Sequence, residues 1–160
     1  MNERKILSII LALSLLMETS AVLARRPRET VLSERTRIEV AYKVNKHSLT
    51  QDYEIIINNK GEVVLYQHNY YDNLDGKSVI KNGKINPDDL RDFKEFIMES
   101  NVFGFDNDYV ANINAAELGS ERIKFTINGE VKEIVMAATT VPARLRAIID
   151  RIEQIKSSIK

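Results

Sequence analysis

Cysteine and tryptophan are absent from the 160-residue sequence, and histidine occurs only twice. Without cysteine, the chain can have no disulfide bond, no thiolate zinc site, no cysteine nucleophile and no cysteine-linked lipid anchor. With so few histidines and no tryptophan, residues that bind metals or stack on carbohydrate are scarce. The composition is compatible with an oxidising compartment.

An excess of charge is also missing, because 23 lysines and arginines balance 23 aspartates and glutamates. This balance argues against a general affinity for nucleic acid or for an anionic membrane. The six glycines occur singly, so no glycine-rich phosphate cradle exists, and no serine stands in a nucleophile elbow. We expect no nucleic-acid partner, no cofactor, no resident metal and no enzymatic activity.

The N-terminus has the pattern of an export signal. A short charged start, Glu3-Arg4-Lys5, precedes the apolar run Ile6–Met17, and small residues follow at Ala21–Ala24. A run of about 12 residues suits a signal peptide and falls short of the roughly 20 that span a bilayer. We predict a cleaved signal peptide at residues 1–24 and a secreted or periplasmic location.

The segment after the predicted cleavage point, residues 25–34, is a basic linker containing Arg25-Arg26-Pro27-Arg28. Its charge leaves an alternative open, because an uncleaved leader with this basic flank would place the domain inside the cell. The membrane would then be a partner only through the leader. A buried helix formed by residues 6–17 is a further alternative.

Residues 35–160 predict a single α+β domain. Apolar and polar residues alternate from Ile38 to Val44, as in a strand with one wet face. Asn58–Gly61 and Asn128-Gly129 predict tight hairpins, because asparagine and glycine tolerate positive φ. The predicted strands are 38–44, 53–57, 62–68, a weaker one at 77–81 ended by Asn82-Gly83, 123–127 and 131–136.

Two helices are predicted. The first begins at Asn86, which can cap free N–H groups, with Pro87 in the first turn, and runs to about Asn101. The second begins at Pro142 and carries one apolar stripe. Asp106–Leu118 lacks periodicity and is predicted to be irregular. The order β-β-β-(β)-α-β-β-α indicates a mainly antiparallel sheet with two helices packed on one face.

One aromatic and polar cluster stands out at the end of the third strand. Alternation places Tyr66, His68 and Tyr70 on a common strand face. Tyrosine is enriched where proteins recognise partners, since it combines contact area with a hydroxyl group. These three residues are the candidate binding site, and the alternative is that their face packs on a helix.

Acidic residues offer weaker candidates. Asp106, Asp108 and Glu117 lie in the irregular segment and would serve a hydrolase only if the fold clustered them. Asp72–Gly76 resembles part of a calcium loop, but the position of the required downstream glutamate holds Asn82. We therefore expect a turn at Asp72–Gly76 and no metal site.

The chain resembles an uncharacterised group of small exported bacterial and archaeal α+β domains. The resemblance is carried by Tyr53–Ile57 with Gly61-Glu62-Val63, the G-x-I turn Gly83-Lys84-Ile85, the aromatic stretch Val102–Phe105, the hairpin Arg122–Met136 and the final helix start Val141–Leu145. It implies a fold and export, and no activity. More distantly, the layout is similar to emfourin-type inhibitors of thermolysin-like metallopeptidases, with no residue carried over as the inhibitory element.

These patterns together predict an extracytoplasmic, non-enzymatic binding domain. Its expected partner is a protein or a component of the cell envelope, recognised through Tyr66, His68 and Tyr70. Inhibition of a metallopeptidase and carboxylate-based hydrolysis are the alternatives.

Overall fold

The structure, a computed structural model, describes residues 35–46, 52–68, 76–110, 119–137 and 140–159. The predicted signal peptide and basic linker, residues 1–34, lie outside the described residues. So do His47, Tyr70 and Glu117.

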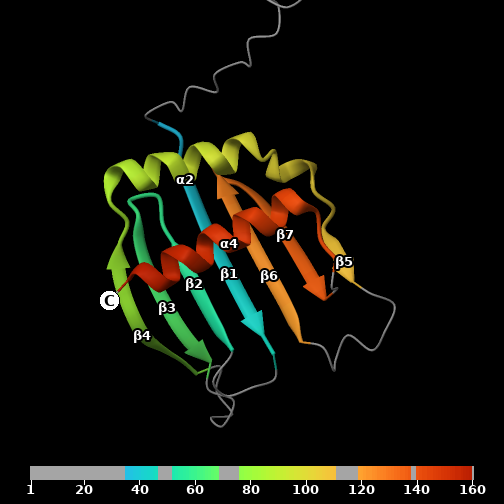
Figure 1. Ribbon diagram of the computed structural model, residues 1–160, viewed down its shortest axis with the longest axis horizontal. Helices are drawn as coiled ribbons and strands as arrows, with labels where there is room; N and C mark the ends of the chain where they lie inside the picture. The colour runs from blue at the N-terminus through green and yellow to red at the C-terminus, as the bar shows by residue number, and fades with distance from the viewer. Residues whose placement is uncertain (1–34, 47–51, 69–75, 111–118, 138–139, 160) are drawn as a thin grey trace, which may run out of the picture. The chain divides into compact units, whose positions relative to one another are not determined.

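The described residues form a sheet of seven strands in the order β4-β3-β2-β1-β6-β7-β5 (Figure 1). Every neighbouring pair is antiparallel except β5 and β7, which run parallel. The strands are β1 (Ile38–Asn45), β2 (Tyr53–Ile57), β3 (Glu62–His68), β4 (Lys77–Lys84), β5 (Asp108–Val110), β6 (Ser120–Ile127) and β7 (Glu130–Ala137). The α+β class and the mainly antiparallel sheet are confirmed.

Both predicted hairpins are confirmed. Asn58–Gly61 joins β2 to β3, and the Asn58 side chain accepts hydrogen bonds from the N–H groups of Lys60 and Glu62. Asn128 and Gly129 have φ of 53° and 92° and join β6 to β7. Positive φ at both central residues gives a turn whose twist matches the strands that it joins.

The prediction for the fourth strand was wrong at its end. β4 continues through Asn82 and Gly83 to Lys84. Gly83 serves close packing here, because a Cβ at this position would lie 2.7 Å from the Ile159 side chain. Glycine therefore marks an approach between chain segments, and the turn expected from Asn82-Gly83 is absent.

The predicted irregular segment also contains a strand. Asp108–Val110 forms β5, which pairs with Val135–Ala137 of β7. Three residues are too few to show alternation, and the pairing joins segments distant in the sequence. The observed order is thus β-β-β-β-α-β-β-β-α, with a short 3₁₀ turn at Val102–Gly104 after the first helix.

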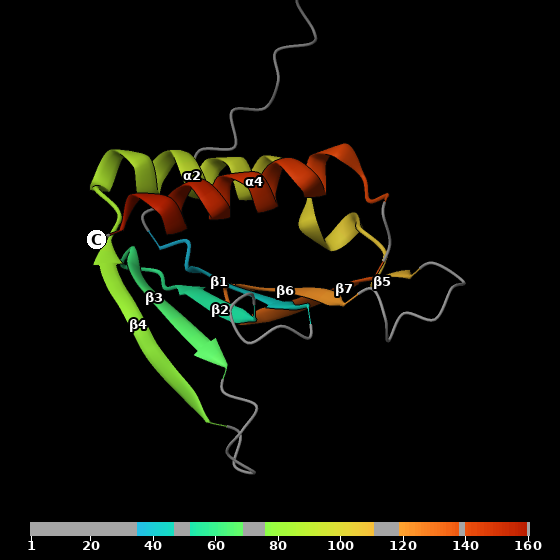
Figure 2. The ribbon, with the colours of Figure 1, turned by 60° about the horizontal axis from the view of Figure 1, so that its bottom comes forward.

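The two described helices are α2 (Pro87–Glu99) and α4 (Ala143–Ser158). Asn86 caps α2 as predicted, since its side chain accepts a hydrogen bond of 2.9 Å from the N–H of Asp89. Figures 1 and 2 show both helices over the same face of the sheet. The apolar stripe of α4 is buried, from Leu145 through Ile155.

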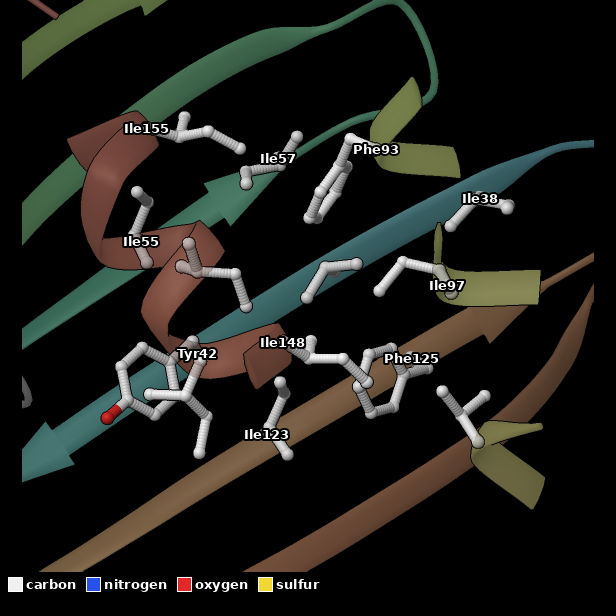
Figure 3. Packing of buried hydrophobic residues seen from close by; sticks show 14 of the residues in the cluster. Ile38, Tyr42, Ile55, Ile57, Phe93, Ile97, Ile123, Phe125, Ile148 and Ile155 are labelled. Carbon is white, nitrogen blue, oxygen red and sulfur yellow. The ribbon is translucent and has the colours of Figure 1, made fainter. Parts of the chain in front are cut away.

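The core lies between this sheet face and the helices, as Figure 3 shows. Alternate residues of β1 are buried, with Ile38, Val40, Tyr42 and Val44 all at 2% exposure or less. Burial of one such apolar side chain stabilises the fold by about 1.5–3 kcal/mol. No described element covers the opposite sheet face, which we call the open face.

Candidate functional site

Tyr66 and His68, the described members of the predicted site, lie on the open face of β3. In the register, Tyr66 lies opposite Glu54 of β2 on one side and Val79 of β4 on the other. Directly opposed residues project from the same face of a sheet. The alternative that this strand face packs on a helix does not apply to the described helices, which lie over the other face (Figure 2).

The Tyr66 ring is held by its neighbours. The Nζ atom of Lys77 lies 4.3 Å from the ring centroid and forms a 2.9 Å ion pair with Glu54. Cation–π contacts of this kind contribute about 0.5–1 kcal/mol at exposed sites. Tyr66 is therefore half-buried within a charged surface.

His68 ends β3 beside Lys77. Its backbone N–H donates to the carbonyl of Asp52, and its Nε2 atom is buried with no hydrogen-bond partner among the described residues. Burial lowers the pKa of His68, and the positive charge of Lys43 lowers it further. The imidazole is thus neutral near pH 7. The third predicted site residue, Tyr70, lies outside the described residues.

The acidic candidates are not brought to a cavity by the residues that the structure describes. Asp106 and Asp108 are exposed next to and within β5, while Glu117 lies outside the described residues. Within the described ranges, no three histidine, aspartate or glutamate side chains gather to hold a metal ion.

A cavity of about 620 Å³ lies between the sheet and α4, which the sequence did not predict. We call it the α4 cavity. Its walls come from β1, β2, β3, β4, the start of β6 and one side of α4. The lining residues are Tyr42, Val44, Lys46, Asp52, Tyr53, Leu65, Gln67, Ile80, Glu121, Arg146, Ile149, Asp150, Glu153 and Lys156.

Tyr42, Glu121 and Arg146 form the first of two linked groups in the wall. The Tyr42 hydroxyl donates a 2.9 Å hydrogen bond to the Glu121 carboxylate, whose same oxygen lies 3.7 Å from the Arg146 guanidinium. Figure 3 shows the Tyr42 ring among core side chains, with its hydroxyl directed away from Phe125. One end of this tyrosine is packed, and the other end is polar.

Tyr53, Glu153 and Lys156 form the second group. The Tyr53 hydroxyl donates to the Glu153 carboxylate, which also pairs with Lys156. The Lys156 Nζ lies 3.9 Å from the centroid of the Tyr53 ring. The Tyr42 and Tyr53 rings meet edge to face, with centroids 6.3 Å apart. The two groups are therefore in contact through their rings.

The pKa values of both tyrosines are raised. Burial is the largest cause for each, and the negative charges of Glu121 and Glu153 add to it. Both hydroxyls therefore stay protonated at neutral pH and act as hydrogen-bond donors. Phenolate chemistry at these two positions is suppressed.

Helical spacing explains the α4 side of the cavity. Arg146, Glu153 and Lys156, with Ile149 and Asp150 between them, follow one side of the helix. Arg146, Glu153 and Lys156 lie beside the apolar stripe of α4, where their side chains reach the sheet.

Alternation alone could have placed Tyr42 and Tyr53 on the core-facing side of their strands. It could not show that they meet, because contact depends on the β1–β2 register, in which Tyr53 lies opposite Val44. It also could not show the rotation of α4, which brings Glu153 to Tyr53. The site depends on long-range packing.

Comparison with known proteins adds no name to this site. No protein-family model and no curated protein matches the chain.

The helices that the structure describes include no candidate membrane span. Neither α2 nor α4 is long and apolar enough to span a bilayer.

The lining of the α4 cavity combines apolar walls with paired charges. Val44, Leu65, Ile80 and Ile149 supply apolar surface, while two glutamates are paired with two cations of α4. Such a wall can hold an apolar body and hydrogen-bond its polar edge. The paired groups are also positioned to exchange partners with a ligand that carries charges of both signs.

Proposed function

We propose that this chain is an extracytoplasmic, non-enzymatic binding domain whose ligand occupies the α4 cavity. One observation carries the binding proposal: a cavity of about 620 Å³ lined by two tyrosine–glutamate–cation groups. Its volume lies within the range of about 300–1,000 Å³ that is typical of ligand sites. The proposal of export rests on the sequence pattern of residues 1–24.

The ligand class follows from the charges of the wall. Glu121 is paired with Arg146, and Glu153 with Lys156, so a charged ligand that binds one member of either pair would leave the other member without its partner. A neutral or zwitterionic molecule avoids this cost. Because Val44, Leu65, Ile80 and Ile149 supply apolar wall, we propose a small molecule with a ring or alkyl body, present in or around the cell envelope.

Binding without reaction is supported by the state of the polar groups in the wall. The raised pKa values keep the hydroxyls of Tyr42 and Tyr53 protonated. The carboxylates of Glu121 and Glu153 accept hydrogen bonds from these hydroxyls and pair with cations. Both carboxylates are thus already engaged within the wall, which favours binding over abstraction of a proton from a ligand.

The test is a titration of the ¹⁵N-labelled chain with ring compounds that are neutral, zwitterionic, cationic or anionic. We expect neutral and zwitterionic compounds to shift the amide signals of Tyr53, Ile149 and Glu153 most strongly. Compounds that shift only amides outside the α4 cavity, or no amides, would contradict the proposal.

Two neighbouring substitutions supply a matched control. Ile80→Trp places a large ring at the rim of the α4 cavity, where Ile80 is 48% exposed. Val79→Trp adds the same ring at an equally exposed position outside the lining. We expect Ile80→Trp to abolish the shifts caused by the ring compounds, and Val79→Trp to keep them.

A further inference from the structure

The outer edge of β4 is open. β4 has eight residues and pairs with β3, and none of the described strands pairs with its other edge (Figure 1). The opposite end of the sheet is formed by the three-residue β5. A long edge strand presents a row of N–H and C=O groups that can accept another strand.

The side chains of β4 are unusually exposed for a strand with an apolar centre. Seven of its eight residues are exposed and the eighth, Gly83, is half-buried. Val79 and Ile80 are 53% and 48% exposed. An incoming strand would cover these two side chains, which would add apolar burial to the main-chain hydrogen bonds.

Lysines stand on both sides of this apolar pair. Lys77 is already paired with Glu54, whereas Lys81 and Lys84 form no ion pair with any residue that the structure describes. Lysines on an edge strand oppose unselective pairing. The same charges favour a strand that carries acidic residues opposite them.

A second copy of the chain is a poor occupant of this edge. Antiparallel pairing of β4 with itself about its centre would set Lys77 opposite Lys84 at both ends of the pair. Like charges directly opposite each other destabilise a strand pair. Two such contacts argue against a β4–β4 dimer and for a partner of opposite charge.

We propose that β4 binds an extended segment of a partner protein by strand addition, with an apolar pair flanked by acidic residues. Main-chain hydrogen bonds to the free edge supply affinity, and Lys81 and Lys84 select the acidic partner. This inference rests on the outer edge of β4, and the proposed site shares Ile80 with the lining of the α4 cavity.

The experiment uses the purified chain and a capped peptide designed for antiparallel pairing. The peptide carries glutamate opposite Lys77, Lys81 and Lys84, valine opposite Val79 and Ile80, and threonine elsewhere. We expect binding by calorimetry, with amide shifts concentrated in β4 and slower hydrogen exchange there. In the free chain, we expect the amide hydrogens of β4 to exchange with solvent faster than those of β3.

Two controls separate strand addition from simple attraction of charges. A peptide of the same sequence, N-methylated on alternate residues, keeps its charge but loses donors along one edge; it should not bind. Replacing Lys81 and Lys84 by glutamate should weaken binding by about tenfold or more. The matched variant Lys124→Glu, on the open face of β6, should bind as the unchanged chain does.

Several results would overturn the proposal. These are equal binding by the N-methylated peptide, no effect of the Lys81→Glu/Lys84→Glu substitutions, shifts confined to other strands, or β4 amides already protected in the free chain. The last result would show that another segment or a second copy covers the edge. Tyr53→Phe removes a hydroxyl of the α4 cavity and should leave peptide binding to β4 unchanged. Loss of peptide binding therefore bears on the β4 proposal and not on the α4 cavity proposal.

Discussion

The Tyr53 hydroxyl donates a hydrogen bond to the carboxylate of Glu153, 100 residues further along the chain. Tyr53 begins β2 and Glu153 lies in the middle of α4, so the bond joins the sheet to the helix at the α4 cavity. Lys156 binds the same carboxylate and lies over the Tyr53 ring. The position of α4 is thus coupled to the shape of the cavity.

Removal of this hydroxyl should destabilise the domain. Tyr53→Phe leaves the ring in place but takes one hydrogen bond from the partly buried Glu153 carboxylate, which we expect to cost about 1–2 kcal/mol. The free energy of unfolding from urea titrations measures this loss. Tyr66→Phe is the matched control, because the Tyr66 hydroxyl has no hydrogen bond among the described residues. Equal losses in the two variants would contradict the importance of the Tyr53–Glu153 bond.

Alkaline pH should destabilise the fold through the same pair of tyrosines. An unfolded tyrosine ionises near pH 10, whereas burial keeps Tyr42 and Tyr53 protonated above that pH. Above pH 10 the unfolded chain therefore binds fewer protons, and the free energy of unfolding falls as pH rises. For the buried Tyr42, the slope approaches about 1.4 kcal/mol per pH unit.

Urea titrations over a pH series measure this slope, and the absorbance of phenolate reports when the tyrosines ionise. Replacing both Tyr42 and Tyr53 by phenylalanine should flatten the decline above pH 10. If the free energy of unfolding of this double variant fell equally steeply above pH 10, the loss of stability would have to come from other groups.

Much of the fold was accessible from local sequence patterns. The alternation of β1, the Asn128-Gly129 turn and the Asn86 cap each follow from the preferences of a few adjacent residues. The errors arose where contacts between residues distant in the sequence determine the local structure. Gly83 looks like a turn residue until Ile159 is known to pack on it, and Asp108–Val110 becomes a strand only beside β7.

The candidate site was less accessible for the same reason. The aromatic cluster at Tyr66 and His68 is visible because its members are close in sequence, and it lies on the open face. The pairs Tyr42–Glu121 and Tyr53–Glu153 join residues 79 and 100 positions apart. A pattern of local spacing cannot reveal such pairs, because the sheet register and the rotation of α4 create them.

The titration of His68 tests the environment at the end of β3. Burial and then Lys43 lower its pKa, Lys77 lowers it further, and the carboxylates of Glu54 and Asp52 act in the opposite direction. We expect the ring protons to titrate below the ordinary midpoint of about 6.5 in nuclear magnetic resonance spectra. As the pH falls below 6.5, the unfolded chain binds a proton first, so the fold loses stability until His68 itself is protonated.

Lys43→Met separates the two main causes of this shift. Loss of the positive charge should raise the pKa of His68 towards its ordinary value, while burial continues to lower it. Lys124→Met, on the open face of β6, is the matched control and should leave the midpoint where it was. An unchanged midpoint in Lys43→Met would mean that the charge of Lys43 is screened from the imidazole.

Two glycines with positive φ should respond differently to alanine. Gly129 has φ of 92° and an added Cβ would meet nothing within 4 Å, so Gly129→Ala should cost only the backbone strain of about 1–2 kcal/mol. Gly119 has φ of 74°, and its Cβ would lie 2.5 Å from the carbonyl oxygen of Asn45. Because that atom belongs to the backbone at the end of β1, the close contact can be relieved only if the end of the strand shifts.

We therefore expect Gly119→Ala to destabilise the domain by about 1–3 kcal/mol more than Gly129→Ala, since overpacking adds to the strain. Midpoints of thermal unfolding for the two variants, converted with the entropy of unfolding, give this difference. In the Gly119 variant, amide shifts should extend to Asn45 and Lys46, which a Cβ at position 119 would contact. Equal midpoints would show that positive φ alone determines how much each alanine destabilises the domain. The end of β1 would then shift without a measurable loss of stability.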